Sequence, residues 1–155
     1  MAKINSETVN KLRQLLSSWV VFYQKCHTYH WDVKGATFLS FHTHLKQLYE
    51  ESVEHCDQIA ERMRQIGELT GITLNGASSD SVVQDTNGET SVNAIAQDLI
   101  AAIAQLTSLQ TEIYNEANEQ GDYVTADLMT QLSKWCEFNS WFLASVAGEE
   151  NETNV

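Results

Sequence analysis

Apolar side chains recur at intervals of three and four residues in several long segments of the chain. This spacing places them along one side of a helix, so each segment is predicted to form an amphipathic helix. We expect the first helix over about residues 5 to 32. The second begins near Phe38, after a break at Gly35, and its apolar stripe continues through Ile66 until Gly67.

The second half of the chain repeats this pattern. Ser91 can cap a third helix, and Gly121 separates that helix from a fourth, which begins near Val124 and includes Phe142. The chain contains no proline, so none of these helices has an internal breaker of that kind. The sequence therefore predicts four long helices arranged in two pairs.

A long polar connection over residues 69–90 separates the two pairs. It is rich in glycine, serine, asparagine and threonine, which favour turns, and we expect a short helix around Ser81 to Gln84. Short links predict antiparallel neighbours, whereas this long link can traverse the length of a bundle. We therefore expect an all-α four-helix bundle with a long crossover, forming a single domain over 1–155. Its core should cover about residues 5–147, followed by a short acidic C-terminal tail.

The composition limits the cellular setting. No stretch approaches the roughly 20 uninterrupted apolar residues that span a bilayer, and the amino terminus lacks the hydrophobic run of a secretory signal. We therefore expect a cytoplasmic protein with no membrane partner. Cys26, Cys56 and Cys136 are odd in number and widely spaced, so we expect reduced core thiols rather than disulfides or a thiolate zinc site.

The formal net charge of −12 makes nucleic acid an unfavourable partner, because affinity for phosphate backbones depends on clustered lysine and arginine. The first residues carry Lys3, Lys11 and Arg13 against Glu7, and the other end is acidic, so we expect no basic arm at either end. Cations are the more natural ligands. The plain alternative is that the acidity serves solubility.

A metal site within one bundle commonly uses Glu-x-x-His pairs, and this sequence contains none. The sequence therefore argues against an intrachain two-metal site. Asp57 and Glu61 are four residues apart on one predicted helix, so their carboxylates can hold a cation between them. The alternative is a solvated acidic face paired with Arg62 or Arg64.

His42 shares the second predicted helix with Asp57, but fifteen residues of helical rise separate them by about 22 Å. They cannot bind one ion within a chain. If two copies pack these helices antiparallel about a two-fold axis, the histidines of one copy meet the carboxylates of the other. Alternatively, His30 and His42 are ordinary core or surface histidines.

The ordered residues His30-Trp31-x-Val33-Lys34-Gly35-x-x-Phe38-x-x-x-His42, followed by Asp57-x-x-Ala60-Glu61-Arg62, resemble the signature of the Dps-type mini-ferritins. The likeness covers about residues 5–147. It implies a ferritin-like bundle that assembles into a dodecameric cage, with ferroxidase centres at its dimer interfaces. Such a cage oxidises Fe²⁺ with hydrogen peroxide or oxygen and stores ferric mineral, which protects against oxidative damage.

The resemblance also implies roles for individual residues. His30 and His42 would be iron ligands from one subunit, and Asp57 and Glu61 would come from its two-fold mate. Trp31 would flank the centre and limit the release of radicals during oxidation, or else serve only in packing. Zn²⁺ would compete with iron for the same imidazoles and carboxylates.

The segment Gly121-Asp122-Tyr123-Val124-Thr125-Ala126-Asp127 resembles the three-fold pore of the same family, where aspartates draw Fe²⁺ inward. Asp122 and Asp127 are the pore candidates. The alternative is that Asp122 caps a helix and Asp127 is simply exposed.

One position departs from the family pattern. Four residues after His42 the family usually has an acidic ligand for a second iron, and this chain has Lys46. A protonated amine has no free lone pair and repels a cation, so the second iron subsite should be weak. We expect Lys46 to pair with Asp57 or Glu61 across the dimer interface when metal is absent. The rival interpretations are a cage that binds metal passively and, less favoured, a cage that compacts DNA.

Overall fold

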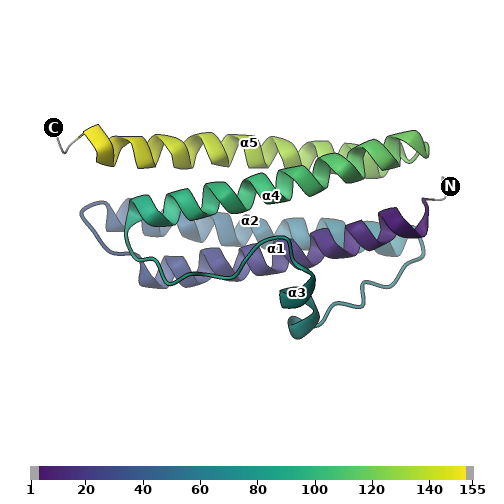
Figure 1. Ribbon diagram of the computed structural model, residues 1–155, viewed down its shortest axis with the longest axis horizontal. Coiled ribbons are helices and arrows are strands. Elements are labelled where there is room, and N and C mark those ends of the chain that lie inside the picture. The colour runs from purple at the N-terminus through teal and green to yellow at the C-terminus, as the bar shows by residue number, and fades with distance from the viewer. Residues whose placement is uncertain (1–3, 153–155) are drawn as a thin grey trace.

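The computed structural model describes residues 4–152, with side chains up to Gly148. Within this range every named element is a helix, as Figure 1 shows, and the predicted all-α fold class is confirmed. The helices are α1 (Ser6–Asp32), α2 (Phe38–Gln65), α3 (Leu74–Asp80), α4 (Val92–Glu119) and α5 (Tyr123–Glu152). The backbone of α5 continues through the acidic residues after Gly148, whose side chains lie outside the described part.

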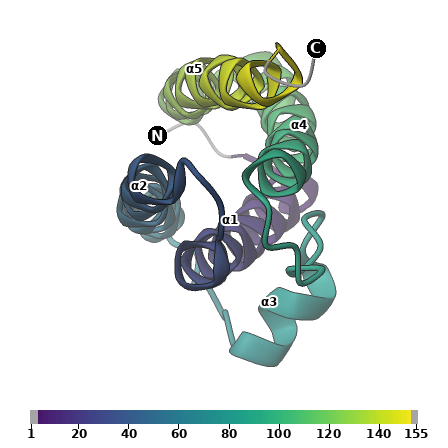
Figure 2. The ribbon, with the colours of Figure 1, turned by 90° about the vertical axis from the view of Figure 1, so that its left-hand side faces the viewer.

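The four long helices form two hairpins. The main packing contacts join α1 to α2 and α4 to α5. Contacts between α1 and α4 hold the two hairpins together, and α2 has few contacts with α5. Figure 2 shows α3 on the outside of the bundle, where it packs against α1. The connection between α2 and α4 thus runs along the outer side of the bundle from one end to the other, as expected for a long crossover.

Backbone geometry at two glycines ends the second and fourth helices. Gly67 and Gly121 have φ angles of 91° and 75°, which residues with a Cβ seldom adopt. In each case the following amide donates back into the last helical turn, at 2.9 Å from Glu68 to Met63 and 2.8 Å from Asp122 to Ala117. This pairing satisfies carbonyls that would otherwise lack a partner. The helix ends predicted at these glycines are confirmed.

The short helix of the crossover lies earlier than predicted. We expected it around residues 81–84, but α3 occupies Leu74–Asp80. Thr73 starts it, since its side chain accepts a hydrogen bond from the amide of Gly76. Ser81 ends it, because its hydroxyl bonds to both the amide and the carbonyl of Val83 and holds that segment in a turn. A serine that pairs with its own backbone competes with helix formation.

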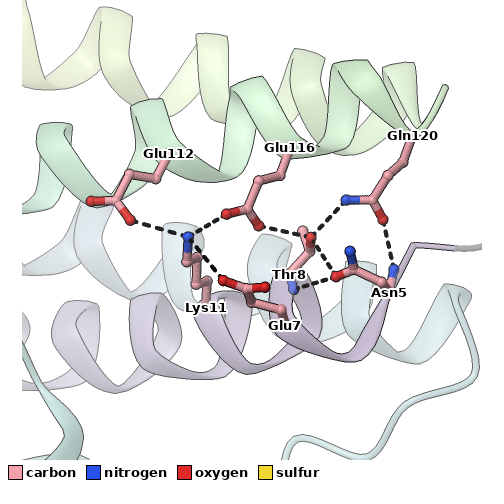
Figure 3. Close-up of polar contacts among 7 residues, drawn as sticks. All are labelled: Asn5, Glu7, Thr8, Lys11, Glu112, Glu116 and Gln120. Atoms are coloured by element: carbon pink, nitrogen blue, oxygen red, sulfur yellow. Dashed lines mark hydrogen bonds and ion pairs between the residues drawn. The ribbon is translucent and has the colours of Figure 1, made fainter.

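A polar network ties the beginning of α1 to the end of α4 (Figure 3). Lys11 contacts Glu116 and, at 3.2 Å, Glu112. Thr8 donates to Glu116 at 2.8 Å, and the amide of Asn5, the cap of α1, donates to Gln120. Lys11 is therefore engaged with carboxylates of its own chain.

Aromatic rings fill the middle of the bundle. Trp19 lies fully buried with its ring centre 5.5 Å from that of Phe22, 5.3 Å from Trp135 and 4.7 Å from His55. Aromatic rings therefore occupy the region where the helices come together. Helix α4 has the length and composition of a membrane span, yet within the described range it is a core helix that packs on α5 and α1.

A buried ion pair joins α1 to α4. The amine of Lys25 lies 2.8 Å from a carboxylate oxygen of Asp98, and the Lys25 side chain is almost completely buried. The same carboxylate accepts a hydrogen bond from Tyr29, whose hydroxyl also contacts Asn87 of the crossover at 2.9 Å. Burial, followed by the bond to Asp98, raises the pKa of Tyr29 to about 12. The network thus fixes both a helix pair and the last part of the crossover.

We predict that Asp98→Ala lowers the free energy of unfolding by about 3 kcal/mol, because it leaves the buried Lys25 ammonium without its charged partner. Lys25→Met should cost less, since it removes the buried charge itself. Urea unfolding at one fixed protein concentration measures both. Asp80→Ala at the exposed end of α3 is the control and should change stability by no more than about 0.5 kcal/mol. An Asp98→Ala variant as stable as this control would contradict the prediction.

Candidate metal centre

The structure brings His30 and His42 together. His30 lies in the last turn of α1 and His42 in the second turn of α2, and the short connection around Gly35 folds one helix back along the other. Their rings stack with centres 3.7 Å apart at an angle of 18°. The amide of Lys34 donates to the carbonyl of Thr90 at 2.8 Å, which attaches this connection to the end of the crossover.

The two histidines hold each other in place through reciprocal hydrogen bonds. Nδ1 of His30 lies 2.8 Å from the carbonyl oxygen of His42, and Nδ1 of His42 lies 2.6 Å from the carbonyl oxygen of His30. The carbonyl of His30 is available because the amide of Lys34, its ordinary helical partner, points to Thr90 instead. The carbonyl of His30, at the end of α1, therefore accepts its hydrogen bond from the His42 imidazole.

These bonds fix the chemistry of the rings. A carbonyl oxygen only accepts, so both Nδ1 atoms must carry hydrogen, and in the neutral form both Nε2 atoms keep a free lone pair. Imidazoles that ligate metals are commonly oriented in this way by a second hydrogen bond to a carbonyl. The pair therefore presents two Nε2 lone pairs, which is compatible with the predicted role of both histidines as metal ligands. That role stays a prediction.

Further aromatic side chains surround the pair. Trp31 is 60% exposed, and its ring centre lies 4.1 Å from that of His27. His27 also stacks on Tyr49 at 4.2 Å, and Tyr49 meets His30 edge-on at 5.4 Å. Burial and the neighbouring charge of His30 lower the pKa of His27. Sequence reasoning assigned no role to His27 or Tyr49, although His27 lies one turn before Trp31 on the same helix.

The predicted carboxylate ligands lie elsewhere on the molecule. Asp57 and Glu61 are both exposed on α2, beyond the reach of the histidine pair. Among the described residues no group of three or more His, Cys, Asp or Glu side chains could hold a metal. The two arginines that could have paired with Asp57 and Glu61 have other partners. Arg62 binds Asp122 at 2.7 Å, and Arg64 donates to the carbonyl of Glu68. The two predicted ligand pairs are therefore separated on a single subunit.

Lys46 lies one turn after His42 and is half exposed. Its amine is 3.6 Å from Glu50, an ion pair within α2. Because both side chains are exposed, this contact holds the lysine only weakly. The amine is therefore free to exchange Glu50 for another carboxylate, and its expected pairing with Asp57 or Glu61 of a second subunit stays a prediction.

The two pore candidates differ in their surroundings. Asp122 is buried and accepts hydrogen bonds from Arg62 and from the amide and hydroxyl of Thr125, which is the helix-capping arrangement. Burial alone would raise the pKa of Asp122, but the bonds from Thr125 and Arg62 outweigh it and hold that pKa below its ordinary value. Asp127 is exposed. Of the two, Asp127 has the free carboxylate that a pore would need.

The three cysteines and the other two histidines, His44 and His55, pack in the core or against it. Cys26, Cys56 and Cys136 are free and lie in the core or against it, as predicted, and burial raises the pKa of all three thiols. His44 stacks on Phe142 at 4.2 Å, and burial lowers its pKa and that of His55. Neither histidine adds a ligand to the pair.

Comparisons with known proteins agree on one family. Residues 9–152 match the family model of the ferritin-like domain. The DNA protection during starvation protein 2 of Bacillus anthracis is 32% identical over 144 residues, which cover 90% of this chain and 96% of that protein. The corresponding protein of Brevibacillus brevis is 29% identical over 136 residues, covering 85% and 89%.

Solved structures give the same result. The crystal structure of Dps from Staphylococcus aureus superposes with a TM-score of 0.89 at 26% identity, covering 93% of this chain and 97% of that one. A Dps protein from Bacillus brevis gives a TM-score of 0.84 at 28% identity, with 89% and 92% covered.

We predict that neutral His30 and His42 both carry hydrogen on Nδ1 and none on Nε2 in the metal-free protein, because each Nδ1 faces a carbonyl oxygen. Solid-state ¹⁵N NMR of histidine-labelled protein distinguishes the two tautomers. His30→Gln and His42→Gln variants identify the two sets of signals. Protonated Nε2 atoms in either ring would show that the reciprocal hydrogen bonds do not form.

Proposed function

This chain belongs to the Dps group of ferritin-like proteins, and from that membership we propose that it builds a dodecameric cage that oxidises Fe²⁺ and stores the ferric product as mineral. Hydrogen peroxide or oxygen would be the oxidant, iron the substrate and the cytoplasm the setting. The consequence for the cell is removal of Fe²⁺ and peroxide together, which suppresses hydroxyl radical formation.

The observation that carries this proposal is the histidine pair. Two imidazoles are held side by side with both Nε2 atoms free, yet no carboxylate of the same chain completes a site among the described residues. Asp57 and Glu61 are exposed one turn apart at the other end of α2. An antiparallel two-fold contact between α2 helices would bring each incomplete set to the other and create two equivalent sites.

The ligand chemistry suits the proposed substrate. Imidazole nitrogen with carboxylate oxygen binds Fe²⁺, and Zn²⁺ competes for the same donors. Each Fe²⁺ that is oxidised gives one electron to the oxidant, and a carboxylate such as Glu61 can bridge two irons where both are bound. The net charge of −12 gives the assembly a field that attracts cations, and exposed Asp127 is the candidate for their entry.

A second candidate function is a cage that binds metal without oxidising it efficiently. Lys46 favours this alternative, because it places an ammonium one turn from His42 where a second iron would need an anionic ligand. DNA compaction finds less support, since Lys11 is paired with glutamates and Arg13 donates to the carbonyls of Leu69 and Thr70. Lys3 lies outside the described residues.

Mixed cages test whether the centre is shared between subunits. We predict that His42→Ala cages and Asp57→Ala cages are each inactive in Fe²⁺ oxidation by peroxide, because every site lacks a ligand. Cages assembled from an equal mixture should regain about one quarter of the wild-type activity, since half of the dimers are mixed and each mixed dimer has one intact site of two.

The control is a mixture of His42→Ala and His30→Ala subunits. Each of these variants lacks one member of the same histidine pair, so no combination of the two restores a site. Light scattering on each sample verifies that the cages assemble. A mixture of His42→Ala and Asp57→Ala subunits that remains inactive would contradict a centre shared in this way.

We predict that Lys46→Asp strengthens binding of a second Fe²⁺ per site by at least about tenfold, because the change removes a repulsion exceeding ~1.4 kcal/mol at contact distance. Oxidation by peroxide should accelerate accordingly. Anaerobic calorimetry counts the bound Fe²⁺, and stopped-flow absorbance follows the oxidation. Lys134→Asp on α5 makes the same charge change away from the centre and should behave as wild type. Equal iron stoichiometry in Lys46→Asp and wild-type cages would show that the lysine is no obstacle.

A further inference from the structure

An aromatic cluster of Tyr23, His27, Trp31 and Tyr49 adjoins the histidine pair on the α1–α2 hairpin. Its contacts are continuous. Tyr49 meets His30 at 5.4 Å between ring centres, His27 stacks on Tyr49 at 4.2 Å, and Tyr23 meets Tyr49 edge-on at 6.1 Å. The three oxidisable rings of the cluster, two phenols and one indole, therefore connect to a proposed iron ligand through direct ring contacts.

Tyr23 differs from the other oxidisable rings in its proton partner. Its hydroxyl lies 3.3 Å from Nδ1 of His27, within the same helix. A phenol that loses an electron also releases its proton, and a base already in hydrogen-bond contact can take that proton as the electron leaves. Such bonds are often slightly long before the reactive complex forms. Trp31, in contrast, is largely exposed and is in contact with the ring face of His27.

The substitution at Lys46 creates a need for such a donor. Reduction of hydrogen peroxide to two molecules of water takes two electrons, and a single Fe²⁺ supplies one. A site with a weakened second iron position must obtain the other electron elsewhere, or release hydroxyl radical. This argument rests on the proposed function, because it requires peroxide to react with Fe²⁺ at the histidine pair.

We propose that Tyr23 supplies the second electron to peroxide at a centre that holds one Fe²⁺, and that His27 receives the phenol proton. The O–O bond of the peroxide breaks, Fe²⁺ becomes Fe³⁺, and the phenol becomes a neutral phenoxyl radical. One proton leaves Tyr23 and reaches water by way of His27, and a second comes from solvent. The balance is Fe²⁺, H₂O₂, one phenol and one solvent proton giving Fe³⁺, two water molecules and one phenoxyl radical.

The test uses assembled cages loaded anaerobically with one Fe²⁺ per subunit and mixed with one equivalent of peroxide. Freeze-quench electron paramagnetic resonance detects the radical, and ring-deuterated tyrosine identifies it by narrowing a phenoxyl signal but not an indole signal. A spin trap measures hydroxyl radical released to solvent. We expect a phenoxyl signal in the wild type, its loss in Tyr23→Phe, and more trapped hydroxyl radical in that variant.

Tyr114→Phe, an exposed tyrosine on α4 away from the pair, is the matched control and should keep the signal. Tyr23→Phe retains the ring and its packing, and light scattering with Fe²⁺ binding verifies its assembly and its site. In Lys46→Asp cages loaded with two Fe²⁺ per site, iron supplies both electrons and the phenoxyl signal should diminish.

The outcomes separate this proposal from the one on which it rests. Wild-type cages that leave Fe²⁺ unoxidised by peroxide would overturn both. Cages that oxidise Fe²⁺ but give an indole signal, or the same phenoxyl signal and trapped radical in Tyr23→Phe as in the wild type, would overturn the role of Tyr23 alone.

Discussion

The structure of the candidate centre depends on two hydrogen bonds that cross the α1–α2 hairpin. Each of His30 and His42 donates from Nδ1 to the backbone carbonyl of the other, so the ring orientations are set by main-chain positions in two rigid helices. The arrangement is possible because the amide of Lys34 donates to the crossover, which leaves the carbonyl of His30 available to the His42 imidazole. Helix termination, loop attachment and ligand orientation are therefore one connected feature.

The same hairpin is the reason for proposing a centre that is shared between two chains. A straight α2 separates His42 from Asp57 by about 22 Å, a distance that no side-chain rotation can close. The interior offers no alternative, since Trp19, Phe22 and Trp135 pack against one another where the helices meet. Burying hydrophobic rings there stabilises the subunit, and it leaves the exposed face of α2 as the place for shared chemistry.

Much of the fold could be predicted from the sequence, because the helix signals are local. Apolar periodicity identified the long helices, and Ser91, Gly67 and Gly121 marked their ends correctly. The short crossover helix was misplaced because Ser81 bonds to Val83, a choice that depends on contacts with α1. The reciprocal histidine bonds and the contact of Tyr23 with His27 escaped prediction, since spacing along a chain does not reveal ring orientation. The ligand roles of His30, His42, Asp57 and Glu61 stay predictions.

Under the proposed function, dividing the ligands between chains would also determine when the chemistry begins. A newly synthesised subunit carries its imidazoles at one end of α2 and its carboxylates at the other, so iron meets only half of a binding site on it. Under the proposed function, oxidation would begin only when subunits join, at the same moment that an enclosed space exists to receive the product. Assembly itself would then prevent iron oxidation by free subunits in solution, outside an enclosed cavity.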